Sequence, residues 1–576
     1  MLVIALACVV GYVANQVLQA KSSLEAAQAS VTQIQSQLSS LDVSALSASA
    51  TDFAGHAHDA ATYTNDPLYK LAEIVPVVGP NLTAVRELSG SLDSIGSQVL
   101  LPVVDFSKTL TPASLKPVDG KLNVALLTSG DATLASADAA IVANVATISA
   151  IPTDGTVSQI SSAKTQLVTA LGKAHTEIGT VRSTVATVQS MLGMNGPRHY
   201  VLAFLNNAET TGLGGGPASL SMLTVDNGAF ALTDHASSQD FPLTDGPVRD
   251  IDQNVKNIFG TGVVSTLNWS TARPDFPTAA LTIQAFWQKY KGGTVDGVIS
   301  IDPIALSYLL KATGPMTLTS GEQITADNAV PLLLHDIYLR FPPLDIETGS
   351  DAFFKDAAAT VFSGITSTSA DPQTLIDAVN KGIDSGNILA WSPIPAEQKL
   401  IASSPLQGVL PTDNAKSTLV GTYFRDVTTS KADYWIQSHV DLSTDVCTNP
   451  TNPTFTETVT LHSTMTVAES ETLPRFVVGG NFGGTQVSTE VYIYGPVGAS
   501  TGEQVAGTTS VSAAVRSSAS DLGRPVARFL VNLKPGETNT VTASFSGVGG
   551  VYGPPVIQTT PMMNTTTTAL TAAGCK

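Results

Sequence analysis

The first forty residues change from a continuously apolar pattern to a helical one. Residues 2–17 are apolar apart from three polar side chains, and no charged residue stands before Lys21. Extended to residue 20, the segment approaches the length of roughly 20 residues that spans a bilayer. We interpret residues 1–20 as a single-pass membrane anchor. A cleaved signal peptide and a lipoprotein attached at Cys8 are the alternatives.

Two long segments beyond the anchor repeat apolar residues at three- and four-residue spacing, which is typical of helices with one apolar stripe. They cover residues 24–45 and 160–192, and shorter helical patterns at 84–100 and 132–148 lie between them. We predict an antiparallel helical stalk over residues 21–193, with the stripes packed on one another. The alternative is a surface that binds a membrane partner.

Strand-like and helical patterns alternate over residues 197–431, which is typical of a layered α/β domain. An apolar strand is predicted at 200–205, followed by a glycine-rich turn at 212–216 and a second strand at 218–225. A further strand is predicted at 263–269. We therefore expect this part of the chain to form one α/β domain.

Short strands separated by turn residues follow over residues 432–576, at intervals typical of a β-sandwich. A threonine-rich stretch at 559–571 ends the pattern. The predicted fold class is therefore α+β multidomain, with an N-terminal transmembrane helix, a helical stalk, an α/β domain and a C-terminal β-sandwich.

Composition narrows the functions that are compatible with this fold. Of the 576 residues only 13% are charged, and the net charge is −18. Nucleic acid selects basic surfaces, so we expect no nucleic-acid partner. His56 and His58 are two residues apart and do not share a helix face, so no zinc site is predicted at this pair. No motif in the sequence specifies a cofactor.

The chain has three cysteines, of which Cys8 lies in the N-terminal apolar segment. Cys447 and Cys575 bracket the C-terminal region. If that region is extracytoplasmic, the two can form one disulfide. Two free buried thiols are the alternative.

Polar residues follow the first predicted strand directly. Asn206, Asn207 and Glu209 are candidates to hold a sugar hydroxyl or a metal, and Gly214 and Gly215 are candidates to offer backbone N–H groups to an anion. Each has a simpler interpretation. Asparagine at a strand end bonds its own backbone, and glycines allow a tight turn without Cβ atoms.

The residues around this turn resemble a known family. The run YVLAFLNNAETTGLGGG, residues 200–216, resembles the opening signature of the bacterial domain-of-unknown-function family 4012. That family commonly has an arginine two residues after the glutamate, where this chain has Thr211, so an anion bound by that arginine is not expected here. Similar blocks follow in order at residues 267–280, 295–315, 324–334, 491–500 and 533–538.

Residues 295–315 also look distantly like the LytR-CpsA-Psr envelope family, whose members attach lipid-pyrophosphate-linked glycopolymers to the cell wall. The shared feature is a strand with a central aspartate, then a helix, Gly-Pro or Gly-Gly, and a short strand. The resemblance implies a LytR-CpsA-Psr-like fold for the α/β domain. The arginine-rich signature of that family is absent from this sequence.

Four further residues are candidates for chemistry on a lipid-linked phosphate. Arg249, Arg273 and Arg340 are candidate phosphate contacts, because a guanidinium matches pyrophosphate with two hydrogen bonds. Asp275 is the candidate catalytic base or metal ligand, with a local turn ion pair to Arg273 as the alternative. Asp302 precedes Pro303 in an ordinary helix-start signature, so capping is the favoured role.

Two functional hypotheses follow. In the first, this is a membrane-anchored, extracytoplasmic cell-envelope protein, single-pass in the cell membrane, that binds or transfers an anionic lipid-linked glycan or cell-wall polymer. In the second, it is a non-catalytic envelope scaffold or adhesion protein. An apolar tunnel beside a basic mouth would favour the first hypothesis. A domain core filled with side chains would favour the second.

Overall fold

The computed structural model describes residues 2–40, 43–118, 120–243, 246–341, 349–367, 370–479, 486–507 and 513–575. The chain forms two compact units. The first unit is Met1–Lys116 with Leu122–Asn195, and the second is Pro117–Lys121 with Gly196–Lys576. The division at 195/196 falls where the sequence pattern changes from helical to mixed. Residues 197–431 and 432–576 lie together in the second unit.

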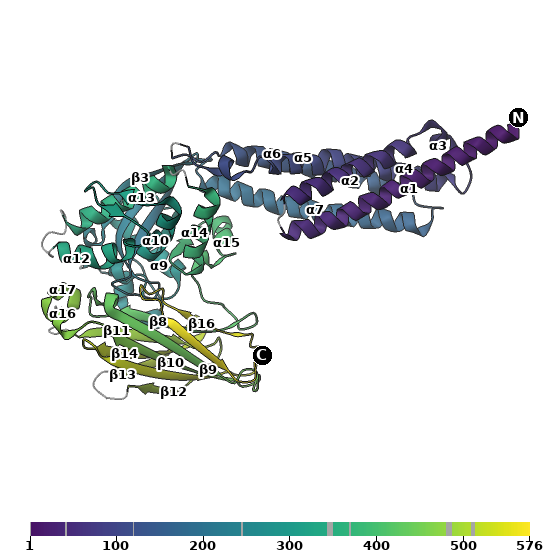
Figure 1. Cartoon of the computed structure of the whole chain (residues 1–576). Helices are drawn as coiled ribbons and strands as arrows, with labels where there is room; N and C mark the ends of the chain where they lie inside the picture. The colour runs from purple at the N-terminus through teal and green to yellow at the C-terminus, as the bar shows by residue number, and fades with distance from the viewer. Residues whose placement is uncertain are drawn as a thin grey trace. The chain divides into compact units, whose positions relative to one another are not determined.

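The first unit is helical (Figure 1). Apolar residues from distant helices, including Ala27, Phe53, Ile141 and Leu171, share one hydrophobic core. The two predicted apolar stripes therefore meet in this core. The helices are α1 (Leu2–Ser40), α2 (Val43–Thr64), α3 (Pro67–Ala72), α4 (Gly79–Ile95), η1 (Gly96–Leu100), α5 (Leu101–Ser107), η2 (Pro112–Leu115), α6 (Ala125–Ala150) and α7 (Ser158–Met191).

The predicted anchor is the first half of α1, which continues without a break to Ser40. The side chains of residues 1–6 lie outside the described part of the chain. Among the described residues, one helix is long and apolar enough to cross a membrane by length and composition alone, and it is α6 rather than an N-terminal helix. Asn144 of α6 donates a hydrogen bond to Ser94 inside the unit. Membrane location therefore stays a prediction.

The second unit begins with a five-stranded sheet in the order β3-β2-β1-β4-β7. Its strands are β1 (Arg198–Asn206), β2 (Gly216–Asp226), β3 (Ala229–Ser237), β4 (Gly297–Ile301) and β7 (Ile388–Trp391). β1 runs parallel to β4, and every other neighbouring pair is antiparallel. The order of β1 and β2 in the sequence, with the glycine turn between them, is as predicted. The region predicted as a strand at 263–269 instead forms two helical turns, η5 (Thr261–Val264) and η6 (Leu267–Trp269).

Helices pack on both faces of this sheet because alternate residues of a strand point to opposite faces. Val201, Ala203 and Leu205 share a core with α9 (Phe276–Tyr290). Leu202 and Phe204 face the other side. The helices on that side include α10 (Pro303–Thr313), η7 (Leu332–Asp336) and α13 (Ser350–Ser367). The other described helices between β3 and β8 (Thr418–Asp426) are η3 (Ser238–Asp240), α8 (Gln253–Phe259), α11 (Ala329–Pro331), α12 (Ile337–Arg340), α14 (Pro372–Asp384), α15 (Pro395–Ile401) and η8 (Pro405–Gln407), and a small hairpin joins β5 (Met316–Thr317) to β6 (Gln323–Ile324).

Two further five-stranded sheets follow, in the orders β12-β15-β10-β9-β17 and β13-β14-β11-β8-β16. Buried residues of both sheets, among them Phe455, Val491, Phe529 and Phe545, form one core. Their strands are β8 (Thr418–Asp426), β9 (Ile436–Thr444), β10 (Thr454–Ser463), β11 (Val487–Tyr494), β12 (Ser500–Ala506), β13 (Ala513–Asp521), β14 (Arg524–Leu533), β15 (Thr538–Ser546), β16 (Pro555–Thr559) and β17 (Thr567–Ala572), with η9 (Ala432–Trp435), α16 (Val467–Thr472) and α17 (Arg475–Val478) between them. β8 precedes the expected border at 431/432, so the C-terminal sheets begin earlier than the sequence pattern indicates.

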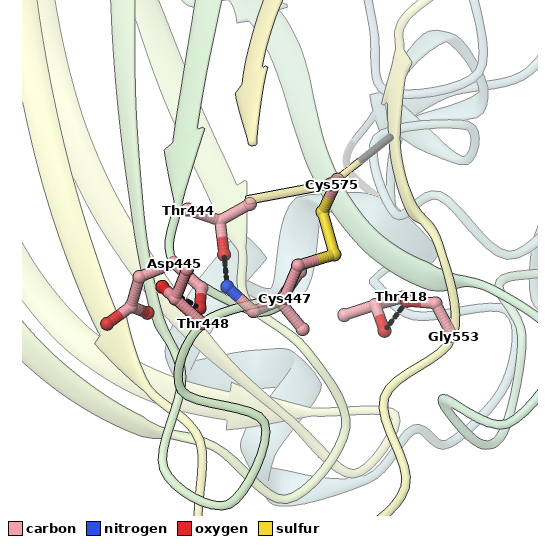
Figure 2. Close-up of a disulfide and its surroundings, with 8 residues drawn as sticks. Thr418, Thr444, Asp445, Cys447, Thr448, Gly553 and Cys575 are labelled. Atoms are coloured by element: carbon pink, nitrogen blue, oxygen red, sulfur yellow. Dashed lines mark hydrogen bonds between the residues drawn. A yellow bond between two sulfur atoms is a disulfide. The ribbon is translucent and has the colours of Figure 1, made fainter. Parts of the chain in front are cut away.

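The threonine-rich end of the chain is built into these sheets. β16 pairs in parallel with β8, and β17 pairs in parallel with β9. Cys575, just beyond β17, forms a disulfide with Cys447 in the turn after β9, with an S–S distance of 1.97 Å (Figure 2). The expected pairing of these two cysteines is therefore present in the structure. Cys8 is free and exposed.

Candidate functional site

An apolar cavity of about 120 Å³ lies between the first sheet of the second unit and the helices α10, η7 and α13. Three of its lining residues, Asn206, Ser219 and Asp302, have polar side chains. The rest are apolar, and they include Leu202, Phe204, Ile301, Pro303, Leu306, Leu333, Leu334, Phe354, Ala357, Ala358, Val361 and Ile365. An apolar cavity of about 150 Å³ stays dry and accepts benzene. The cavity is therefore suited to a small apolar group or to the end of a hydrocarbon chain.

A buried polar cluster closes one side of this cavity. Asp302 caps α10 by accepting a hydrogen bond from the Ala305 N–H at 2.9 Å, as the helix-start signature predicts. Its Oδ2 atom accepts further bonds from Asn207 Nδ2 at 3.0 Å and from Asn387 Nδ2 at 2.6 Å. Burial raises the pKa of Asp302 to about 6, although these hydrogen bonds favour the ionised form. Asn387 precedes a buried strand, and nothing in its sequence context distinguishes it from a turn residue.

A wider, open cleft of about 640 Å³ adjoins the cavity, and Asn206, Ala218 and Phe354 line both. Its polar lining includes Glu209, Gln239, Asn268, Asp351 and Lys431, and its aromatic lining includes Trp269, Tyr338 and Phe476. The cleft and the cavity together offer a polar space next to an apolar one. That combination suits a ligand with a polar head and an apolar tail.

Lys431 and Glu209 form an ion pair in this cleft. The Lys431 Nζ atom lies 5.0 Å from the centre of the Tyr338 ring, and the Tyr338 hydroxyl accepts a hydrogen bond from Asn206 Nδ2 at 2.7 Å. Burial lowers the pKa of Lys431 to about 7, while the adjacent Glu209 carboxylate favours the charged form. Lys431 and Tyr338 were not identified from the sequence, because neither belongs to a motif.

The glycine-rich turn packs tightly against the end of β1. A Cβ atom on Gly215 would lie 2.3 Å from the carbonyl carbon and oxygen of Asn206, and Gly214 has a φ of +113°. The N–H groups of Leu213, Gly214 and Gly216 donate to backbone carbonyl groups. Those three amides are therefore engaged in holding the turn rather than exposed to an anion.

The predicted phosphate contacts do not gather at the cavity or the cleft. Arg273 pairs with Asp275 and, through two hydrogen bonds, with Asp521 of β13. Arg340 pairs with Glu322 at 2.7 Å, and Arg249 lies 3.4 Å from the Thr278 carbonyl oxygen. Neither these arginines nor Asp275 are among the residues that line the two spaces.

The contacts of Asp275 are those of a structural residue rather than of a catalytic base. It stands at the N-terminus of α9, where it pairs with Arg273 and accepts a hydrogen bond from Thr278. The local ion pair weighed as the alternative is thus what the structure contains. Across the described residues, no three His, Cys, Asp or Glu side chains form a group that could hold a metal ion.

Many of the residues that shape this site, among them those of β1, β2 and the glycine turn, fall in one segment of the chain. Residues 195–338 match the family model DUF4012, described as a protein of unknown function. The family resemblance predicted from the block around Asn206 and Glu209 is confirmed. The DUF4012 segment supplies Asn206, Asn207, Glu209, Asp302 and Tyr338 to the site. Lys431 and the C-terminal sheets, with the similar blocks at 491–500 and 533–538, lie outside the matched residues.

Comparisons with curated proteins and with solved structures add two findings. No curated protein matches the sequence. A solved structure, the Lin1025 protein from Listeria innocua, is similar at 15% sequence identity and a TM-score of 0.21, covering 40% of this chain and 85% of its own. A likeness at that level carries no argument about function.

Proposed function

We propose that the DUF4012 segment binds an amphiphile, a lipid-linked glycan, with the end of its hydrocarbon chain in the apolar cavity and its polar head in the adjoining cleft. The observation that carries the proposal is the shared lining of the two spaces, in which Asn206, Ala218 and Phe354 border both. A cavity of about 120 Å³ holds the end of a chain. The larger cleft holds the head.

The head group is specified by the chemistry of the cleft. Gln239 and Asn268 line the cleft with amides that can bond sugar hydroxyls. Lys431 is the cation of the cleft lining, and its partner Glu209 leaves little net positive charge. A glycan with one anionic group fits this arrangement better than a densely charged pyrophosphate.

The proposal is for binding without group transfer. The predicted base Asp275 and the guanidinium of Arg273 are held in an ion-pair cluster with Asp521. That cluster is satisfied by protein partners, so it offers no free base and no free phosphate contact. The function therefore combines the ligand class of the first hypothesis with the non-catalytic character of the second.

We place this protein in the cell envelope, anchored by residues 1–20, with the remainder extracytoplasmic. The uncharged apolar N-terminal segment supports the anchor. The Cys447–Cys575 disulfide supports an oxidising compartment. In the same proposal, the helix-covered first sheet is a LytR-CpsA-Psr-like layer, and the two C-terminal sheets with their shared core are a β-sandwich.

The test compares two leucine substitutions on α13. Ala358 lines the cavity, whereas Ala359 is exposed on the same helix and does not line it. The full chain is purified from detergent-solubilised membranes, extracted with organic solvent, and the extract is analysed by mass spectrometry. We expect a lipid-linked species to accompany the wild type and Ala359→Leu but not Ala358→Leu. Equal recovery from all three, or no lipid from the wild type, would exclude the cavity as the binding site.

A further inference from the structure

A polar pocket lies on one of the two C-terminal sheets, over the strands β9 and β10 (Figure 1). It has a volume of about 330 Å³. Eight residues line it, and each of them is glutamine, serine, histidine, threonine or asparagine. The pocket shares no lining residue with the apolar cavity or the cleft, so it is separate from the site described above.

Strand alternation and strand pairing bring the lining residues together. Alternate residues of β10 are buried in the core, and Thr460 and His462 are half-buried residues on the opposite face. In the pairing with β9, Gln437 lies opposite His462 and His439 lies opposite Thr460. On the other side of β9, Thr567 of β17 lies opposite His439, and its hydroxyl is 2.6 Å from the His439 Nδ1 atom. Three neighbouring strands therefore contribute to one pocket.

The stretch just before β17 forms the remaining wall of the pocket. Asn564 Nδ2 donates hydrogen bonds to the carbonyl oxygens of Tyr434 and Ile436, both at 2.9 Å. The hydroxyls of Ser438 and Thr566 share a buried hydrogen bond of 2.7 Å. This wall is therefore fixed to the sheet by side-chain contacts on both sides of the lining residue Thr565.

Three of the lining side chains keep open hydrogen-bonding groups. Gln437 and Thr565 are exposed, and within the described part of the chain their side chains make no hydrogen bond. His462 is bonded through Nδ1 to the Thr538 hydroxyl at 2.9 Å, and its Nε2 atom has no partner among the described residues. An amide, a hydroxyl and an imidazole can each donate or accept a hydrogen bond. Together they match a ligand rich in hydroxyl groups, which also do both.

The composition of the lining argues against other classes of ligand. Among its eight described residues there is no lysine or arginine, which nucleic acid requires, and no tryptophan or tyrosine, which anchor many protein partners. There is also no carboxylate to balance a cationic ligand. The methyl groups of the threonines can contact the C–H groups of a sugar ring, while the open polar groups bond its hydroxyls. A neutral glycan fits this combination.

We propose that this pocket binds a short stretch of neutral glycan, whose hydroxyl groups are bonded by Gln437, His462 and Thr565. These three residues come from β9, from β10 and from the stretch before β17, so the glycan lies across the strands rather than along one of them. The pocket is a second glycan contact, distinct from the cavity and the cleft of the proposed function. It needs neither a lipid tail nor an anionic group.

The experiment measures saturation-transfer difference NMR signals of maltotetraose, cellotetraose and chitotetraose with the full chain, kept in a detergent that has no sugar head group. Thr460→Met fills the pocket with a longer apolar side chain, and Thr458→Met is its matched control. Both threonines are half-buried on the same face of β10. Each shares a hydrogen bond with a threonine of β15, Thr458 with Thr542 at 3.0 Å and Thr460 with Thr540 at 3.2 Å. Of the two, Thr460 alone lines the pocket.

We expect saturation transfer to at least one tetrasaccharide from the wild type and from Thr458→Met, and loss of that signal in Thr460→Met. Gln437→Ala, which removes an exposed side chain without filling the pocket, should weaken the signal. Asn268→Ala, in the cleft of the proposed function, should leave it unchanged.

Two results would overturn the inference directly: no transfer to any of the three probes from the wild type, or equal transfer from Thr460→Met. A signal that is lost in Asn268→Ala and kept in Thr460→Met would assign glycan binding to the cleft, which supports the proposed function and overturns the second site. If both methionine variants lose the signal, Gln437→Ala decides, and a full signal from that variant would overturn the inference.

Discussion

Arg273 holds Asp521 through two hydrogen bonds, from Nε to Oδ2 at 3.0 Å and from Nη2 to Oδ1 at 2.7 Å, across a sequence separation of 248 residues. Asp521 also accepts a hydrogen bond from the Tyr494 hydroxyl at 2.9 Å. The pair is largely buried, with 16% and 3% of the two side chains exposed. It joins the helix-covered sheet to the C-terminal sheets within the second unit. An arginine that the sequence offered as a phosphate contact is thus a structural link.

Arg273→Ala should destabilise the second unit without removing a bound lipid. Removing one partner of a buried ion pair leaves an uncompensated charge, at a cost of about 3–5 kcal/mol. All four tryptophans lie in the second unit, so tryptophan fluorescence during denaturant unfolding follows that unit.

Arg516→Ala serves as the control, because Arg516 is an exposed arginine of β13. Its unfolding midpoint should match that of the wild type. A normal midpoint for Arg273→Ala together with loss of the co-purified lipid would contradict the structural role and restore the phosphate-contact hypothesis.

Reduction of the Cys447–Cys575 disulfide should loosen the end of the chain. The two cysteines are 128 residues apart. A disulfide that closes a loop of that length lowers the entropy of the unfolded chain, which raises the free energy of unfolding by on the order of 4–5 kcal/mol. β17 has largely exposed residues and is held by its pairing with β9, so it depends on this link more than its neighbours do. We expect a lower unfolding midpoint and faster amide exchange in β17 after reduction or in Cys575→Ser. Cys8→Ser should change neither, and an unchanged midpoint in Cys575→Ser would show that strand pairing alone suffices.

Glu457 should make the stability of the second unit fall with rising pH. It is buried on β10 and accepts a hydrogen bond from Thr422, and burial raises its pKa to about 8. The unfolded chain releases this proton near pH 4.5, so the folded state binds more protons between pH 4.5 and 8. Stability contributed by the neutral carboxyl is therefore complete below pH 4.5 and lost as pH rises through 8.

Glu457→Gln removes this titration, since the amide stays neutral throughout. The difference in unfolding free energy between the variant and the wild type should grow from pH 5 to pH 8, as measured by denaturant unfolding at a series of pH values. Asp302 and Lys431 titrate in both proteins, so their contributions to the unfolding free energy cancel in this difference. Parallel curves for the two proteins would mean that Glu457 is ionised in the folded state.

Lys431 should react with amine reagents at neutral pH. Burial lowers its pKa to about 7, so its neutral, nucleophilic form is abundant at neutral pH. We expect trace acetylation of Lys431 to rise through neutral pH and to level off above pH 8. Glu209→Gln should shift the Lys431 midpoint to lower pH, because it removes the carboxylate that favours the charged form. Acetylation of Lys431 that keeps rising above pH 8 would contradict this assignment.

Local patterns were sufficient for much of the architecture. Alternation and turn residues located β1, β2 and the glycine turn, because side chains on a strand reach opposite faces whatever the rest of the chain does. Asp302 was recognisable as a helix cap from its position before Pro303, since capping is a contact within one turn. The strand predicted at 263–269 was wrong because an apolar run is equally compatible with buried helical turns such as η5 and η6.

The sequence by itself determined elements such as β1 and β2, the family resemblance of residues 195–338 and the candidate polar residues at the end of β1, because each depends on neighbours along the chain. The tertiary structure alone decided which of those residues share a site. It brought Glu209 to Lys431 and Asn207 to Asn387, and it took Arg273 away to Asp521. Asn207 and Asn387 meet through Asp302, which is 95 residues from Asn207, and Arg273 and Asp521 are 248 residues apart. No local pattern in the sequence encodes contacts over such separations. Side-chain chemistry can be read along the chain, but a site is made by contacts that only folding brings about.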